Sequence, residues 1–112
     1  MKTSNKQLFR NICKSYNFSY SVKPKFHNSL YADLPYIHSW SFLLKYDTHT
    51  HKIYMPEYLR LGNNNDYIFC HGVFEYEPKK FSQLVSDYRT LVLKMKQYNI
   101  NLKLKEIQKD FI

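Results

Sequence analysis

The sequence predicts an α+β domain: a small antiparallel sheet of three to four strands, with an N-terminal helix and a long C-terminal helix packed on one face. Apolar residues recur every three or four positions near both ends of the chain, which is typical of amphipathic helices. The middle alternates between apolar and polar residues, which is typical of half-buried strands. The segments between these strands are too short for crossover helices, so the strands should pair as hairpins. The length of 112 residues suits one domain, and we treat residues 1–112 as such.

The N-terminal part is expected to form a helix, a strand and a loop in that order. The helix covers residues 4–16, because Ser4 and Gln7 fit a capping box and apolar residues follow at helical spacing. Residues 18–22 alternate between apolar and polar and should form a short strand. Residues 23–35 contain two prolines and no sustained period, which indicates a loop. The apolar stripe of the helix consists of Leu8, Phe9, Ile12, Cys13 and Tyr16.

Residues 36–46 show the clearest alternation and are predicted to form a strand. Residues 47–50 should then close a hairpin onto a return strand at 51–55. One side of the first strand carries a stripe of rings that has two interpretations. On an exposed face such rings stack on unpaired nucleic-acid bases, whereas under a helix they belong to the core. We favour burial, because the amphipathic C-terminal helix needs a sheet to cover. The stripe comprises Tyr36, His38, Trp40 and Phe42.

The segment after Pro56 is expected to be helical or irregular as far as Leu61. A surface turn should follow at residues 62–66, because glycine and asparagine favour turns. Residues 67–76 are rich in β-branched and aromatic residues and should form another strand, with Gly72 as a bulge.

The C-terminal helix is the most strongly indicated element. It should begin at Pro78, and apolar residues follow at helical spacing as far as Tyr98. The segment 99–101 contains two asparagines and is predicted to interrupt the helix. Residues 100–112 fit either a last short helix or a strand, and the sequence alone does not separate these alternatives.

Positive charge is concentrated at the two ends of the chain. The net charge is +8; residues 1–32 carry six basic and no acidic residues, and residues 88–112 carry six basic and two acidic ones. The middle is nearly neutral. Such asymmetry indicates nucleic acid, an anionic membrane face or an acidic protein surface as a partner, although a solubilising surface is the simpler alternative.

We expect the two terminal helices to lie side by side, so that their basic residues merge into one binding surface. Such a surface would hold a phosphate backbone without reading the base sequence. The candidate binding residues are Lys2, Lys6, Arg10, Lys14, Lys23, Lys25, Arg89, Lys94, Lys96, Lys103 and Lys105.

The motifs of nucleotide-dependent enzymes are missing from the sequence. Only two glycines occur, which excludes a P-loop or a dinucleotide-binding fingerprint, and no cofactor is expected. His49 and His51 are weak metal candidates, because alternate residues of a strand share a face; exposed turn histidines are the simpler interpretation. Cys70 and His71 are adjacent in a predicted strand, so they should face opposite sides and not act together. We therefore expect a protein that is not an enzyme.

The two cysteines, Cys13 and Cys70, are too few for a disulfide framework and are expected to be free buried thiols. The sequence has no apolar signal region and no stretch long enough to span a membrane. We accordingly expect a cytoplasmic protein without a membrane partner.

The leading hypothesis is a small basic protein that binds RNA or DNA, or a nucleoprotein such as a guide-RNA nuclease. The abundance of Lys, Asn, Tyr, Ile and Phe is typical of AT-rich genomes, which suits an accessory protein of a phage or mobile element. An inhibitor of the anti-CRISPR kind is one concrete form. The first alternative is a protein–protein module that self-associates through aromatic surface. The second is a metal-dependent enzyme using His49 and His51. RNA is not distinguished from DNA, and the oligomeric state stays open.

Overall fold

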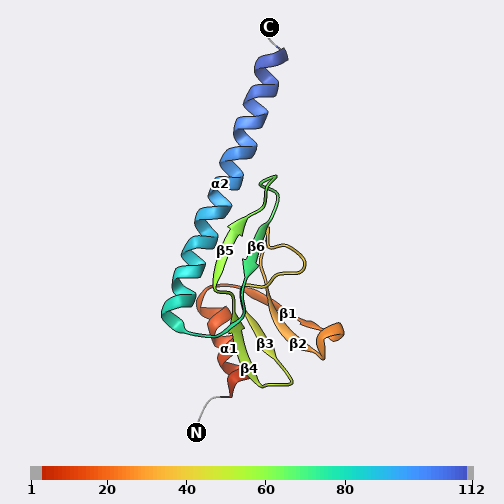
Figure 1. Ribbon diagram of the computed structural model, residues 1–112, viewed down its shortest axis with the longest axis vertical. Coiled ribbons are helices and arrows are strands. Elements are labelled where there is room, and N and C mark those ends of the chain that lie inside the picture. Colours follow the sequence, from red (N-terminus) through yellow and green to blue (C-terminus); the bar gives the residue numbers. More distant parts are fainter. Residues whose placement is uncertain (1–3, 111–112) are drawn as a thin grey trace.

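The protein folds into two antiparallel sheets, and a different helix packs on each of them (Figure 1). The computed structural model describes the backbone of residues 4–110 and the side chains of residues 4–105. Helix α1 (Asn5–Ser15) lies on a five-stranded sheet, and helix α2 (Pro78–Asp110) lies on a separate two-stranded sheet. The predicted α+β class is confirmed. The prediction of three to four strands with both helices on one face is wrong.

Helix α1 forms as predicted. The Oγ of Ser4 accepts a hydrogen bond from the backbone N–H of Gln7 at 3.1 Å, which satisfies one of the free N–H groups at the helix start. Phe9, Ile12 and Cys13 recur at helical spacing and are buried against the sheet. The apolar stripe of α1 therefore anchors this end of the molecule.

The five-stranded sheet has the strand order β1-β2-β3-β4-β7, with every neighbouring pair antiparallel. Leu30, Tyr46 and Ile53 lie opposite one another on adjacent strands, so they share the face that α1 covers. Among residues 4–110, no α-helix covers the other face. The strands are β1 (Ser19–Lys23), β2 (Ser29–Asp33), β3 (Lys45–Asp47), β4 (Lys52–Met55) and β7 (Phe74–Glu75).

The loop predicted at residues 23–35 is wrong, because this segment contains the 3₁₀ helix η1 (Pro24–Phe26) and all of β2. His27 and Asn28 adopt positive φ angles of 55° and 60°, which turn the chain back on itself. Asparagine and histidine tolerate this left-handed conformation better than most residues. The turn lets β2 pair with β1 along five residues of each strand.

The long strand predicted at residues 36–46 is also wrong, because β3 begins only at Lys45. Tyr36 has a φ of 69°, which an extended strand does not allow. Leu43 and Leu44 are consecutive and both fully buried, which breaks the alternation of a half-buried strand. A single bridge between Ile37 and Ile68 ties this loop to the second sheet.

The predicted hairpin at residues 47–50 is confirmed between β3 and β4. The Oδ1 of Asp47 accepts hydrogen bonds from the backbone N–H groups of His49 at 2.8 Å and Thr50 at 3.1 Å. Partial burial disfavours the charged carboxylate, but these N–H groups and the ammonium of Lys45 outweigh it. They hold the pKa of Asp47 below its usual value.

The second sheet is the hairpin of β5 (Tyr58–Leu61) and β6 (Ile68–His71), joined by the predicted turn at residues 62–66. The prediction of a helical or irregular piece before Leu61 is therefore wrong. Gly72 has a φ of 82° and separates β6 from β7, so the strand predicted at 67–76 is divided between two sheets. A Cβ at this glycine would lie 3.0 Å from Cβ of Glu57.

Helix α2 runs without a break through the segment 99–101, so the predicted interruption is wrong. Residues 100–110 are helical, which settles the alternative between helix and strand over that range; residues 111 and 112 lie outside the described residues. The first half of α2 packs on the inner face of the β5–β6 hairpin. Its buried residues are Phe81, Leu84, Val85, Tyr88 and Met95.

The molecule is elongated because α2 continues past the hairpin into solvent (Figure 1). Its extents are 68 × 29 × 22 Å, and its radius of gyration is 17.0 Å, against about 13 Å for a compact domain of similar length. Within the described residues, no helix is long and apolar enough to cross a membrane.

The burial of Phe9 yields a test of the α1 packing. Changing Phe9 to Ala should lower the free energy of unfolding by about 3–5 kcal/mol, because the ring is fully buried and its removal leaves a cavity. The neighbouring Leu8 is 36% exposed, and Leu8→Ala should cost less than about 1 kcal/mol. Urea unfolding of both variants measures the difference, and equal losses would contradict the orientation of α1.

Candidate functional site

The outer face of the β5–β6 hairpin carries a row of aromatic and cationic side chains. In β5, Tyr58 and Arg60 share this face, while Leu59 and Leu61 pack toward α2. In β6, His71 lies opposite Tyr58, and Phe69 lies opposite Arg60. Directly opposed residues share a sheet face, so these four side chains form one continuous group, the hairpin ladder.

The members of the hairpin ladder stack on one another. The rings of Tyr58 and His71 have centroids 4.8 Å apart and planes at 14°. The guanidinium of Arg60 lies 5.8 Å from the ring centroid of Phe69, and its Nε donates to Nε2 of His71 at 3.3 Å. Tyr58 is still 51% exposed. The ladder is therefore ordered by its own contacts and remains open to solvent.

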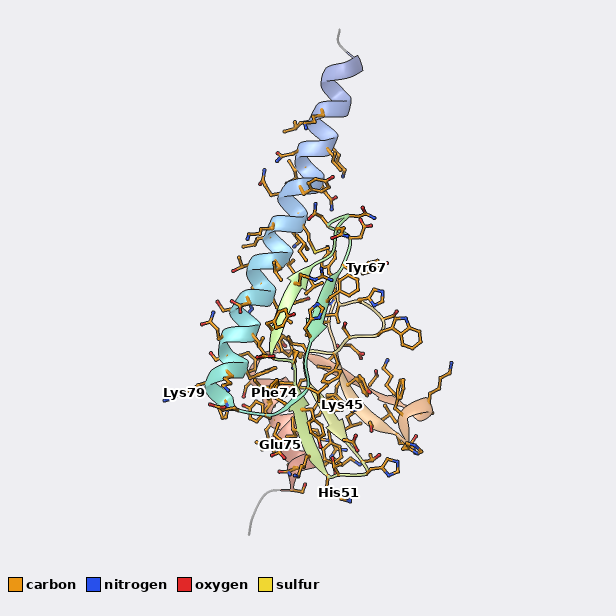
Figure 2. The ribbon with its side chains drawn as sticks, in the orientation of Figure 1. Lys45, His51, Tyr67, Phe74, Glu75 and Lys79 are labelled. Carbon is orange, nitrogen blue, oxygen red and sulfur yellow. The ribbon has the colours of Figure 1, made fainter. Side chains whose placement is uncertain are left out.

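The row continues from the hairpin ladder to His38 in the preceding loop. The His38 ring stacks on Phe69 with centroids 4.6 Å apart and planes at 24°, and it meets Tyr67 edge-on at 5.8 Å. Backbone hydrogen bonds hold the loop: His38 N donates to Ile68 O at 3.0 Å, and Ile68 N donates to Tyr36 O at 2.7 Å. Figure 2 shows Tyr67 on the side of the hairpin turned away from α2.

Trp40 lies in the middle of the same loop and is 85% exposed, more than any other large apolar side chain among the described residues. Its backbone is nevertheless anchored. Trp40 N donates to Nδ1 of His38 at 3.3 Å, and Ser41 N donates to His38 O at 2.8 Å. The Oγ of Ser41 in turn accepts from Cys70 N at 3.2 Å. The indole is thus presented to solvent by a fixed backbone.

The predicted burial of the stripe Tyr36, His38, Trp40 and Phe42 is wrong for its outermost rings. Because residues 36–44 form a loop and not a strand, the four side chains do not share one face. Tyr36 is 38% exposed, and Trp40 is more exposed still. Phe42 is half-buried below the ammonium of Lys45, which lies 5.5 Å from its ring centroid.

Two hollows meet at His38, which lines both. The first has a volume of about 330 Å³ and lies between Arg60, Tyr67, Phe69 and the turn at residues 62–66. That volume is at the lower end of the range for ligand pockets. Its walls combine aromatic rings, a guanidinium and the amide side chains of the turn. Such walls can stack on a planar polar group and form hydrogen bonds with its edge.

The second hollow has a volume of about 280 Å³ and is lined in part by Lys23, Phe26 and Tyr31. Phe26 is 48% exposed and stacks on Tyr31 with ring centroids 5.8 Å apart. Lys23 is 3.9 Å from the carboxylate of Asp33, a long and exposed ion pair that contributes little. Lys25, in η1, is exposed beside Phe26. The structure thus brings two of the predicted basic residues, Lys23 and Lys25, to the aromatic surface.

Three other predicted residues form the α1 ridge, Lys6, Arg10 and Lys14, on the exposed side of α1. No ion pair between described residues involves them. Arg10 and Lys14 also line a shallow groove with Phe18 and Tyr20. The α1 ridge lies on the side of the five-stranded sheet opposite to Lys23 and Tyr31, so it does not border the hollows. Lys2 lies outside the described residues.

The predicted merging of the two helices into one basic surface is wrong. Helices α1 and α2 meet where Tyr16 contacts Phe81, with ring centroids 5.3 Å apart. From Phe81, α2 runs away from α1, so that Lys105 lies about 36 Å further along the helix axis (Figure 1). The basic residues of α2 that the sequence singled out are exposed. They are Arg89, Lys94, Lys96, Lys103 and Lys105.

His49 and His51, the two histidines considered as metal ligands, contact different residues. His49 packs edge-on against His27 with ring centroids 4.1 Å apart, whereas Nδ1 of His51 lies 3.0 Å from the hydroxyl of Tyr46. Among the described residues, no group of three His, Cys, Asp or Glu side chains is placed to hold a metal ion.

Both thiols are free; Cys13 is buried, as predicted, whereas Cys70 is only partly buried. Burial raises the pKa of Cys70 to about 12 and, together with the negative charge of Asp33, raises the pKa of Cys13 to about 11. Cys70 packs toward α2, while His71 belongs to the hairpin ladder on the other face. The prediction that they face opposite sides is therefore confirmed.

The chain matches no family model, and no curated protein or solved structure is significantly similar to it.

The residues of the hairpin ladder and Tyr67 were not among the predicted binding residues. The available signal was the alternation of Tyr58 with Arg60 and of Tyr67 with Phe69 and His71. Pro56 obscured the first half of this pattern, because it made the segment after it look irregular. The contribution of His38 depends on a loop conformation that no sequence period encodes.

The raised thiol pKa values predict slow alkylation of the native protein. At pH 8, iodoacetamide should modify Cys70 in the Cys13→Ser variant at least about a hundredfold more slowly than in urea, because little thiolate is present. Mass spectrometry over time measures both rates. Rapid modification of the folded protein would contradict the partial burial of this side chain.

Proposed function

We propose that this protein binds single-stranded nucleic acid, with unpaired bases stacking on Trp40 and on the rings around His38. The observation that carries the proposal is a fully presented indole, 85% exposed, on a loop whose backbone is held by hydrogen bonds. Exposing such a ring to water is unfavourable, and a stacking partner removes that cost. Aromatic side chains that project from a fixed backbone are the usual platforms for unpaired bases.

The surroundings of these rings favour a nucleic acid over a neutral aromatic ligand. Arg60 lies in the hairpin ladder, Lys23 lines the second hollow, and Lys25 is exposed next to Phe26 in the chain, so cations flank the rings on two sides. Phosphates that follow a stacked base would meet these groups. The net charge of +8 attracts polyanions from a distance and speeds their encounter with the protein.

Single strands suit the surface better than duplexes do. The two hollows are separate depressions that share His38, and each is large enough for a planar group rather than for a groove-filling element. Bases within a duplex are stacked on each other and are unavailable to such rings. The α1 ridge, on the other side of the sheet, contributes to the overall attraction without touching the bases.

A protein with this activity can act on a nucleoprotein by covering an accessible stretch of its RNA or DNA. Inhibition of a guide-RNA nuclease is one form that the proposed function takes, because such complexes expose unpaired guide nucleotides. The alternative, self-association through the same rings, rests on the same exposure and is separated from it by the experiments below.

The stacking proposal predicts a large effect of Trp40. Trp40→Ala should weaken binding of a fluorescein-labelled oligothymidylate or oligouridylate by about 5- to 150-fold, the range expected for one lost stacking contact. Fluorescence anisotropy measures the affinity. Trp40 is the only tryptophan, so quenching of intrinsic emission in the wild-type protein reports directly on stacking at this ring.

A matched pair of variants controls for the loss of an exposed ring. Tyr67 and Phe74 are 52% and 47% exposed, but Figure 2 places Phe74 near the start of α2, away from Tyr67. Tyr67→Ala should weaken binding, and Phe74→Ala should leave it unchanged. Absence of binding at low salt, or a dimer that dissociates on Trp40→Ala, would refute the proposal.

The phosphate contacts predict a local salt effect. Binding should weaken as salt rises, and Lys25→Gln should reduce the slope of log affinity against log salt by about 1, as for one lost phosphate contact. Lys79→Gln removes the same charge at the far side of the molecule and should leave the slope unchanged (Figure 2). Equal slopes for both variants would show that the charge acts only through the net field.

A further inference from the structure

The second half of α2 projects beyond both sheets and exposes large apolar side chains (Figure 1). Leu93, Ile100 and Leu104 are 67%, 51% and 52% exposed. In a protein of this size such residues are ordinary when scattered, but here they recur along one helix. They form a second stripe, distinct from the one that packs on the hairpin.

The spacing of this stripe is that of a coiled-coil seam. Leu93 and Ile100 are seven residues apart, and Leu104 follows four residues later, so they occupy the two core positions of a heptad repeat. At about 100° per residue they lie between roughly a third and a half of a turn around the helix from Tyr88 and Met95, which face the hairpin. We call Leu93, Ile100 and Leu104 the α2 seam. By sequence alone the spacing continues at positions 107 and 111.

The helix around the α2 seam has low intrinsic helix propensity and little buried surface to stabilise it. The segment from Tyr98 to Asn101 contains an aromatic residue, two asparagines and the β-branched Ile100, all weaker helix formers than alanine or leucine. All side chains from 96 to 105 are exposed. A helix without tertiary contacts is marginal in water, so a second helix lying on the seam would stabilise this segment.

The charges beside the α2 seam specify what can lie there. Lys94, Lys96 and Lys103 flank it at the positions that pair with a partner helix in coiled coils. Residues 88–105 contain five basic and no acidic residues. A second copy of this chain would bring lysines against arginine and lysines, which is unfavourable. A partner helix with glutamate or aspartate at its flanking positions would place negative charges against these lysines, which is favourable.

The narrowness of the α2 seam argues against a membrane surface as its occupant. Helices that lie on membranes have a broad apolar face, whereas a seam of one residue per turn is typical of helix pairing. Gln97 occupies the core position between Leu93 and Ile100. A polar residue at such a position fixes the register of a helix pair and would be unfavourable in lipid.

We propose that the α2 seam docks an acidic amphipathic helix of another protein, paired along Leu93, Ile100 and Leu104. This interaction does not depend on the proposed binding of nucleic acid, because the α2 seam and the hairpin ladder involve different side chains. The protein would then join a nucleic-acid strand at one surface to a protein partner at the other.

The test uses the full chain and two synthetic heptad-repeat peptides with leucine core positions, one with glutamate and one with lysine at the flanking positions. The glutamate peptide should bind, and the lysine peptide should bind at least about tenfold more weakly. Isothermal titration calorimetry gives both affinities. The double variant Ile100→Ser/Leu104→Ser should lose at least about tenfold in affinity for the glutamate peptide.

Two further variants keep the test decisive if the first loses helicity. Tyr98→Ser/Leu102→Ser removes apolar side chains of similar exposure, 42% and 41%, from another side of the helix and should change the affinity by less than about twofold. Lys96→Glu/Lys103→Glu leaves the α2 seam intact and should reverse the preference between the peptides. Trp40→Ala should bind the glutamate peptide normally, which separates this proposal from the previous one.

Three results would overturn the proposal. Equal affinity for both peptides would show non-specific apolar binding. A dimer in sedimentation equilibrium that is lost in Ile100→Ser/Leu104→Ser would assign the α2 seam to a second copy. Binding to vesicles of anionic phospholipid, without binding to the glutamate peptide, would assign it to a membrane surface.

Discussion

The packing of α2 on the inner face of the β5–β6 hairpin is the contact on which the rest of the molecule depends. Leu59, Leu61 and the fully buried Ile68 supply the hairpin side of this contact. A two-stranded hairpin alone is marginally stable in water, and α2 provides the apolar surface that it needs. Because one face of the hairpin is committed to this contact, alternate residues along its strands must face solvent. The hairpin ladder occupies that outer face.

The same contact positions the two candidate surfaces. The hydroxyl of Tyr88 donates to Pro35 O at 2.7 Å, which ties the loop of His38 and Trp40 to α2. Burial raises the pKa of this hydroxyl to about 12, so it remains a donor over the physiological range. The hairpin in turn packs only against the first half of α2, as far as Met95. The side chains of residues 96–105, beyond the hairpin, are exposed, and the α2 seam is turned away from the hairpin.

The class of the fold, the two helices and the hairpin turn at residues 47–50 follow from the sequence. The capped helix at Ser4 and the Asp47 turn are encoded by short-range hydrogen bonds, and the long run from Phe81 to Met95 by helical spacing. The division into two sheets depends on Gly72, which has a positive φ angle. This angle is set by the packing of the folded chain, and the local sequence does not predict it. The exposure of Trp40 depends on the loop at residues 36–44. Apolar and polar residues alternate in this loop as they do in a strand, but its backbone is not extended.

We propose that bases contact the outer side of the hairpin and the loop around Trp40, rather than the basic helices. Two-dimensional ¹H–¹⁵N correlation spectra of the labelled protein, recorded while unlabelled oligothymidylate is added, test it most directly. We predict the largest shift changes at Trp40, including its indole N–H, and at the residues of the hairpin ladder. Changes confined to the α1 ridge or to the projecting part of α2 would contradict the account.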